Sequence, residues 1–302
     1  MDIMKKQKIW VLCLAGMVCL FSCDNENEEN NCGVTELPME LTAVVEWGGL
    51  TRASSDNIWT GDGTEKVSVS DGSKTVGYTI VNAEGEMLPT NENDMLYWAS
   101  ATEMQSVMAW YPATTDNSPM TSWSVQSNQS GEGFQQSDLL MCNTEVSFQG
   151  NRTLPFIHQT AKVVIHLQGD GETDAELEGA TLKINNVALE GIVSNSELKM
   201  KPDADATQEI IPKRMADTEF GYLASYEALL IPQLVEGVSF IEIKTSDDKI
   251  YRYVPQNNNG LLKGAHQNVY YVIVGKPGIS VIVEKEDASW GYETDENVEA
   301  VN

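Results

Sequence analysis

The chain has 302 residues, 41% of them hydrophobic, and it carries a formal net charge of −26 at pH 7. Residues 1–22 hold three Lys and one Asp, a net charge of +2, so the remaining residues together carry −28. A surface this acidic repels nucleic acid and anionic membranes, and this excludes nucleic-acid binding. The roughly 280 residues after this first segment are enough for two ordinary domains.

The first 22 residues have the order of parts of a lipoprotein signal peptide. Lys5, Lys6 and Lys8 form a basic start, and the apolar run 9–21 that follows is too short for a stable membrane anchor. The run ends in Leu-Phe-Ser-Cys, which resembles the bacterial lipobox, whose Cys becomes the acylated first residue of the mature protein. We therefore predict an exported lipoprotein with lipid on Cys23. The alternative is a simple secretory signal.

Residues 24–31 are Asp, Glu and Asn alone. Such a segment cannot bury enough apolar surface to fold, and we expect a flexible tether. It also resembles the acidic export signal that follows the lipidated Cys in Bacteroidetes lipoproteins, which implies the outer surface of the outer membrane. A solvated linker is equally compatible with its composition.

The cysteines predict no structural disulfide. Cys13 and Cys19 belong to the signal peptide and Cys23 to the lipid site, while Cys32 lies in the tether. Cys142 is left, and we expect it to behave as a small buried apolar residue.

Alternating runs rich in β-branched and aromatic residues recur along the chain, and helical periodicity is scarce. The predicted strands are 41–47, 66–70, 76–81, 95–99, 107–111, 162–167, 180–184, 240–244, 249–254, 269–274 and 279–283. Polar turn signals separate them, which predicts antiparallel β-sandwiches. Short helical turns are expected at 104–108 and 216–226. A domain boundary is expected between Phe148 and Leu154.

The titratable residues suggest no catalytic or metal site. His158 and His166 would face the same side of one unbroken strand, and with His266 they complete the histidines. No metal-ligand spacing and no Gly-x-Ser-x-Gly motif accompanies them. We therefore expect ordinary structural histidines, no cofactor and no enzyme. An extracellular hydrolase is the weakest of the functions considered, because no acid and base residues converge.

Two other patterns have a functional and a structural interpretation. The acidic segments 61–63 and 170–174 lack the ligand order of a calcium loop, and hairpin tips are the simpler interpretation. Several aromatic residues could form a carbohydrate platform, but core packing explains them equally well. They are Trp98, Trp110, Tyr111 and Trp123.

A set of short motifs occurs in a distinctive order over nearly the whole chain. They are Leu-Thr-Arg-Ala-Ser at 50–54, Trp-Thr-Gly-Asp at 59–62, Ser-Asp-Leu-Leu at 137–140, the run 154–165, Leu-Lys-Gly-Ala at 262–265, the strand 269–274, Gly-Ile at 278–279 and Trp290. This order and spacing resembles the fimbrillin family, the Mfa-like subunits of type V pili in Bacteroidia.

The resemblance implies a fold of two stacked transthyretin-like antiparallel β-sandwich domains. Carried over to this chain, it gives a signal peptide at 1–22, a tether and first strand at 23–52 that form a possible propeptide, and domains at 53–150 and 151–302.

It also implies a mechanism of assembly at the outer membrane. An Arg-specific protease would cut between Arg52 and Ala53 and release the first strand. Other subunits would then join head to tail, each donating a C-terminal strand from 279–301 to its neighbour's groove. The candidate groove fillers are Val281, Val283, Trp290 and Tyr292.

Two further readings remain open at this point. Arg52 could be an ordinary exposed loop residue rather than a cleavage site. The alternative to a fimbrial subunit that serves adhesion is a surface lipoprotein that binds glycans and does not polymerise.

Overall fold

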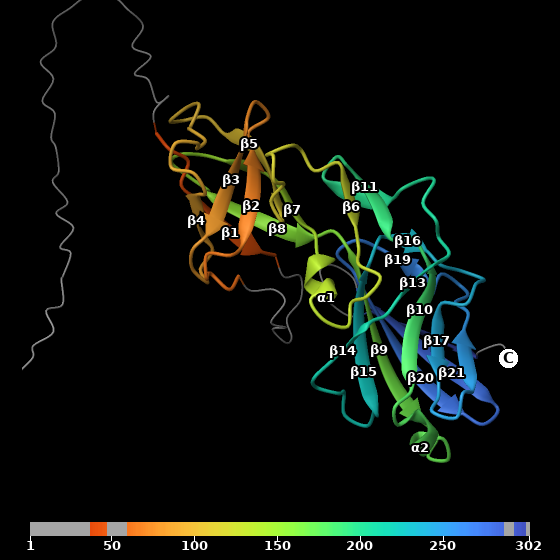
Figure 1. Cartoon of the computed structure of the whole chain (residues 1–302). Coiled ribbons are helices and arrows are strands. Elements are labelled where there is room, and N and C mark those ends of the chain that lie inside the picture. Colours follow the sequence, from red (N-terminus) through yellow and green to blue (C-terminus); the bar gives the residue numbers. More distant parts are fainter. Residues whose placement is uncertain (1–36, 47–58, 287–292, 300–302) are drawn as a thin grey trace, which may run out of the picture. The chain divides into compact units, whose positions relative to one another are not determined.

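The computed structural model describes residues 37–46, 59–286 and 293–299, and its regular structure is almost entirely β-strand (Figure 1). The helices of this described part are single turns, α1 (Gly133–Gln136) and α2 (Asp174–Leu177). The predicted all-β class is therefore confirmed. The relation of the two predicted domains to transthyretin stays a prediction.

The N-terminal strands form a closed barrel. Its strands are β1 (Leu41–Val45), β2 (Lys66–Ser70), β3 (Thr75–Ile80), β4 (Glu86–Pro89), β5 (Gln105–Tyr111), β7 (Leu140–Val146) and β8 (Thr153–His158). Their order around the barrel is β1-β4-β3-β2-β5-β7-β8. The alternation of the sequence sets the two faces, as in β3, where Val76, Tyr78 and Ile80 are buried and the residues between them are not.

The C-terminal strands form open sheets. A six-stranded sheet has the order β14-β15-β9-β20-β21-β22, a four-stranded sheet β13-β10-β17-β18, and smaller sheets are β12-β11-β6 and β16-β19. The bounds are β6 (Ser122–Ser124), β9 (Ala161–Gly169), β10 (Thr181–Val187), β11 (Glu190–Ser194), β12 (Glu197–Met200), β13 (Gln208–Ile210), β14 (Lys213–Arg214), β15 (Ala224–Leu230), β16 (Gln233–Leu234), β17 (Ile241–Lys244), β18 (Ile250–Tyr253), β19 (Leu261–Leu262), β20 (Gln267–Gly275), β21 (Gly278–Glu286) and β22 (Glu293–Glu299). Side chains of the two larger sheets share one core, among them Ile165 and Tyr270 from the first and Ile184 and Ile243 from the second.

The strand pairing shows where one sheet system ends and the next begins. Strand β8 pairs with β7 and β1, so it belongs to the barrel. Strand β9 begins at Ala161 and pairs with β15 and β20. The turn signal at Gly150 closes the hairpin between β7 and β8, where the Ser147 N–H donates to the Asn151 carbonyl at 2.9 Å. The boundary predicted at 150–151 therefore falls inside a hairpin of the barrel.

Several local predictions differ from the structure. The segment expected to form a helical turn at 104–108 begins strand β5, and 216–226 contains no helix. The run 95–99 forms only an isolated bridge between Pro38 and Tyr97, although Leu96 and Trp98 are buried. His158 and His166 lie on different strands rather than on one.

Cys142 has the predicted character. It lies on β7, is 2% exposed and packs in the barrel core. Burial, with a smaller contribution from Glu46, raises the pKa of its thiol to about 12. The thiol is therefore an unreactive apolar group at neutral pH.

Candidate assembly site

Strand β1 closes the barrel. It pairs in parallel with β8, from Thr42 opposite Thr153 to Val45 opposite Phe156, and antiparallel with β4, where Leu41 lies opposite Met87. The other strand pairs of the barrel are antiparallel. Parallel neighbours cannot be joined by a tight turn, so β1 and β8 meet across a long stretch of chain. The closing strand is thus a separate segment rather than one arm of a hairpin.

The two faces of β1 differ sharply in exposure. Leu41 is 2% exposed and Ala43 is fully buried, and Met39 just before the strand is 2% exposed. Val44 points the other way and is 37% exposed. A strand with this alternation fills one slot in the barrel wall and completes the apolar core beneath it.

The backbone of β1 is held on both sides at Ala43. Its N–H donates to the Gly85 carbonyl at 2.8 Å, and its carbonyl accepts from the Trp59 Nε1–H at 3.1 Å. Gly85 has φ +84°, and a Cβ built there would lie 1.8 Å from the Ala43 carbonyl oxygen. Only glycine allows the turn before β4 to approach β1 this closely.

Loss of β1 would open the barrel along its length. Strands β4 and β8 would each expose a row of unpaired N–H and C=O groups. Apolar side chains of the core, among them Met87, Leu154 and Phe156, would line the floor of the gap. A groove with two strand edges and an apolar floor accepts an extended segment with alternating apolar residues.

Most of the residues predicted for processing and donation lie outside the described residues. They are Cys23, Arg52, Ala53, Trp290 and Tyr292. In the sequence, Arg52 and Ala53 belong to the segment that links β1 to Trp59. A cut there would separate β1 from the rest of the barrel in covalent terms.

Val281 and Val283 lie in β21. This strand pairs with β20 over its whole length, and both valines are 1% exposed in the core of the C-terminal sheets. In this structure both valines pack in the hydrophobic core of the same subunit. Donation of β21 itself would take both valines out of this core.

Strand β22 is the last described element. Among the described strands it pairs only with β21, from Lys285 opposite Glu293 to Ser280 opposite Glu299, with a register shift near Val281. It thus forms an edge of the six-stranded sheet. An edge strand has one row of backbone hydrogen bonds, and it is removed more easily than an interior one.

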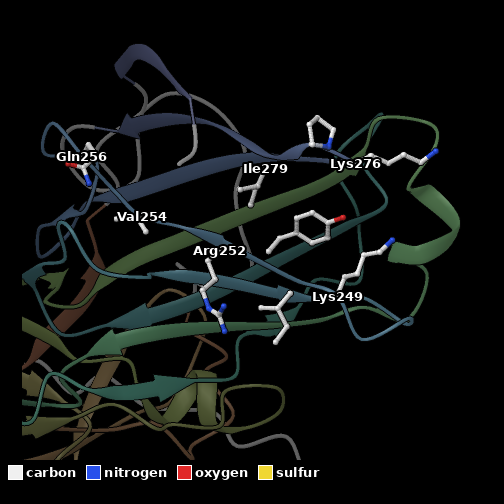
Figure 2. A pocket seen from close by; sticks show the side chains of 10 residues that line it. Lys249, Arg252, Val254, Gln256, Lys276 and Ile279 are labelled. Carbon is white, nitrogen blue, oxygen red and sulfur yellow. The ribbon is translucent and has the colours of Figure 1, made fainter. Parts of the chain in front are cut away.

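A cavity of about 770 Å³ lies between β18 and the start of β21. Figure 2 shows Lys249, Arg252 and Val254 on one side of it and Lys276 and Ile279 on the other. The cations are already paired with carboxylates: Lys249 with Glu176 at 3.1 Å, Arg252 with Glu242 at 2.9 Å, and Lys276 with Glu172 at 2.7 Å. The cavity is therefore poorly suited to an anion. Strand β18 is a sheet edge, and Arg252 in it and Lys249 just before it discourage pairing with another chain.

The histidines make structural contacts. The Nδ1 of His158 lies 2.8 Å from an Asp138 carboxylate oxygen, and the Nδ1 of His266 lies 2.6 Å from the Gly264 carbonyl oxygen. The Nδ1 of His166 lies 2.8 Å from the Ser225 hydroxyl, a pair that sequence spacing did not reveal. Ser225 is fully buried, so its hydroxyl is out of reach of a substrate.

The acidic loops hold their carboxylates with local hydrogen bonds. Asp62 accepts from the N–H and the hydroxyl of Thr64, at 2.9 and 2.6 Å. Asp170 accepts from the N–H groups of Glu172 and Thr173, at 3.0 and 3.1 Å. These bonds lower the pKa of Asp62, and together with the Thr173 hydroxyl they outweigh burial and lower that of Asp170. No group of three or more His, Cys, Asp or Glu in the described ranges could hold a metal ion.

The aromatic residues divide between core and intermediate positions. Trp98 is 1% exposed and Trp110 fully buried, each within a core cluster, so core packing accounts for both. Trp123 and Tyr111 are half-buried. The indole N–H of Trp123 donates to the Ser137 carbonyl at 3.0 Å.

The described part of the chain contains no helix with the length and apolar character that a membrane crossing requires.

Comparisons with known proteins agree with this architecture. Two crystal structures, provisionally assigned as cell adhesion proteins, have the same fold. The one from Bacteroides uniformis has a TM-score of 0.63 and 17% identity, covering 83% of this chain and 98% of its own. The one from Bacteroides ovatus has a TM-score of 0.62 and 16% identity, covering 88% of this chain and 98% of its own. No protein with a curated description matches the chain.

The family match spans both sheet systems. A model described as fimbrillin-like matches residues 51–290, which run from the segment after β1 to the segment before β22. The resemblance stated from the short motifs is thereby confirmed, and the chain belongs to the fimbrillin-like family.

Proposed function

We propose that the chain is a non-enzymatic subunit of a cell-surface fimbria that serves adhesion and assembles by exchange of β-strands. The observation that carries the proposal is the position of β1, a separate parallel strand that closes the barrel and whose removal leaves a two-edged groove. Membership of the fimbrillin-like family supports the fimbrial setting.

The proposed order of events begins at the membrane. Lipid on Cys23 anchors the precursor in the outer membrane, with the acidic residues 24–31 as its tether. An Arg-specific protease then cuts between Arg52 and Ala53, and β1 leaves with the propeptide. The cut is favourable for assembly because an open barrel with unpaired edges is unstable until another strand fills it.

The strand that fills the groove comes from the tail of a neighbouring subunit. Because Val281 and Val283 are buried in their own core, the proposed donor is limited to residues 287–302, with Trp290 and Tyr292 as groove fillers. The donor would take the place of β1, parallel to β8 and antiparallel to β4. A head-to-tail contact of this kind does not close on itself, so it propagates a filament.

The test is the N-terminus of assembled surface material. We expect Ala53 in the wild type, and an uncut, non-polymerising precursor in Arg52→Ala and in Arg52→Lys, which keeps the charge. Arg214→Ala is the matched control, since Arg214 is another of the four Arg residues and is exposed on β14. Assembly of the Arg52→Ala chain with β1 still attached would refute the proposal.

Lipidation has its own test. In Cys23→Ala, metabolic labelling with a fatty acid should disappear and the protein should leave the membrane fraction. Cys32→Ala, in the same tether, should keep both. Continued labelling of Cys23→Ala would overturn the anchor.

A further inference from the structure

A second cavity, of about 510 Å³, lies on the outer face of the N-terminal barrel. Its floor includes Gly77 of β3, whose neighbours Val76 and Tyr78 are buried, so that position 77 faces away from the core. Its walls come from Thr90–Asp94, from Tyr111 at the end of β5 and from the loop 112–117 that follows. This volume falls in the range of small-ligand sites, about 300–1,000 Å³.

The absence of a side chain at position 77 keeps the floor of the cavity open. A Cβ built on Gly77 would lie 3.5 Å from the Thr90 hydroxyl oxygen and 3.7 Å from the Asn117 amide oxygen. Gly77 does not have a positive φ, so the backbone does not require glycine there. The glycine leaves open the space between two polar side chains.

The wall formed by the loop after β5 is fixed to the barrel. The Thr114 N–H donates to the hydroxyl of the fully buried Ser68 at 3.2 Å, and the Thr114 hydroxyl donates to the Ser118 carbonyl at 2.7 Å. The Ala113 N–H donates to the Lys66 carbonyl at 2.8 Å. These bonds hold the loop over β2, so this side of the cavity is formed before any ligand arrives.

The opposite wall is fixed to β3. The Thr90 N–H donates to the Gly77 carbonyl at 2.8 Å, and the hydroxyls of Thr90 and Thr79 lie 3.0 Å apart. Asp94 forms an ion pair with Lys74. Its carboxylate is therefore neutralised, and the cavity does not attract a cation strongly.

Some polar groups that line the cavity have capacity for a ligand. The side-chain amide of Asn117 and the ammonium of Lys66 have no hydrogen bond to another side chain or backbone group in residues 37–46, 59–286 and 293–299. Tyr111 also lines the cavity, but its ring packs against the barrel core and against Trp59, with ring centroids 5.5 Å apart. The cavity thus offers donors and acceptors side by side.

We propose that this cavity binds a neutral carbohydrate. Adjacent sugar hydroxyls each donate and accept, which matches the amide, ammonium and threonine hydroxyl groups around one small space. An extended peptide is a poor fit, because β2 and β3 are interior strands of a closed barrel and offer no free edge. The site goes beyond assembly and does not depend on it.

The experiment uses the full mature chain on an array of neutral oligosaccharides that end in mannose, galactose or N-acetylglucosamine, with sialylated and sulfated glycans beside them. We expect binding to members of the neutral set. Calorimetry then measures the dissociation constant of the strongest neutral ligand for two variants. Gly77→Val fills the floor of the cavity, and Asn117→Gly removes the amide at a residue whose φ of 55° glycine adopts readily. Each should bind about tenfold more weakly or worse, the value of one or two lost hydrogen bonds.

Matched controls separate the site from general damage. Gly131→Val makes the same change at an exposed loop glycine with no atom within 4 Å of its Cβ, and Asn257→Gly makes the same change at φ 54° in the exposed turn between β18 and β19. Both should bind as the wild type does. If Gly77→Val does not fold, the affinity of Asn117→Gly alone tests the proposal. The proposal is overturned if no neutral glycan binds, if only acidic glycans bind, or if the cavity variants bind like their controls.

Discussion

The N-terminal barrel and the C-terminal sheets solve the problem of exposed strand edges in different ways. The barrel has no free edge while β1 is in place, because β1 joins β4 to β8. The C-terminal sheets are open, and their outer strands include β14, β22, β13 and β18. The N-terminal barrel thus depends on β1 for closure, whereas the C-terminal sheets have free edge strands in the folded state.

Under the proposed strand exchange, this difference suits the two regions to different parts in assembly. Removing a strand from the closed barrel creates two new edges and an apolar gap, a high-energy state that a partner strand relieves. Removing the edge strand β22 from the open sheet leaves an edge where an edge already was. The barrel therefore suits the role of acceptor and the tail of the C-terminal region the role of donor.

The largest expected effect on stability comes from placing a charge on the buried face of β1. Leu41→Asp places a carboxylate at a position that is 2% exposed, and we expect a loss of about 4 kcal/mol or more in the free energy of unfolding. Val44→Asp makes a comparable change on the same strand at a position that is 37% exposed, and it should cost within about 1 kcal/mol. Urea unfolding of the uncut chain measures both. Equal costs would show that β1 is not part of the closed core.

A buried ion pair gives the C-terminal region a comparable weak point. Lys162 on β9 and Glu227 on β15 lie 3.2 Å apart, each 5% exposed, and Lys213 approaches the same carboxylate at 2.7 Å. Glu227→Ala removes the carboxylate that both lysines face and should cost about 3 kcal/mol.

The control for that variant is an exposed pair. Glu209→Ala breaks the contact with Lys183. The side chain of Glu209 is 52% exposed and that of Lys183 is 41% exposed, so the free energy of unfolding should fall by at most about 1 kcal/mol. Thermal unfolding, monitored by a spectroscopic probe in the C-terminal region, should show a clearly lower midpoint for Glu227→Ala and almost no change for Glu209→Ala. A Glu227→Ala chain as stable as Glu209→Ala would mean that the pair adds nothing to the fold.

The sequence predicts the long alternating strands well and the short ones poorly. The run 66–70 coincides with β2 because its apolar residues alternate, and 269–274 lies within β20 because all of its residues are β-branched or aromatic. Strands β13, β14 and β16 have two or three residues each, too few to show a period. Their place is set by partners elsewhere in the chain.

The closure of the barrel could not be predicted from local pattern. The sequence marks 41–47 as a strand but carries no sign that it runs parallel to β8, more than a hundred residues later. The turn signal at Gly150 lies between β7 and β8, and a turn signal alone does not say which strands it joins. The Ser225–His166 contact likewise depends on the pairing of β9 with β15.

A smaller effect should appear as the pH falls, and it belongs to the C-terminal region. His166 packs against Tyr222 and Tyr271, with ring centroids 5.3 and 5.2 Å away. Burial lowers its pKa below the usual 6.5, while Glu219 and Glu284 oppose the shift. Since the unfolded chain binds this proton more readily, the stability from neutral His166 is complete above pH 6.5 and is lost as the pH falls through the lower folded value.

The measurement is the midpoint of thermal unfolding between pH 7.5 and pH 5. His166→Asn, which retains an acceptor for the Ser225 hydroxyl, should flatten the dependence in this window whatever its stability at pH 7.5. Cys142→Ala, in the barrel core, serves as a variant that lowers stability without touching a histidine, and it should keep the wild-type slope. An unchanged slope in His166→Asn would exclude the imidazole as the source.

The smallest effect on the monomer is expected from a truncation that should nevertheless abolish assembly. Ending the chain at Glu286 removes β22, which among the described strands pairs only with β21, and leaves β21 paired with β20 over its whole length. Val281 and Val283 stay in the core through that pairing, so the free energy of unfolding should fall by no more than about 2 kcal/mol.

If residues 287–302 are the donor, the truncated chain should fold and be cut at Arg52 but form no filament. It should still accept the tail of an intact subunit and so cap growth. Mixing truncated with intact chains and measuring filament length tests this. Filaments of normal length made from truncated chains alone would place the donor elsewhere, and loss of the fold would mean that β22 belongs to the C-terminal core rather than to its edge.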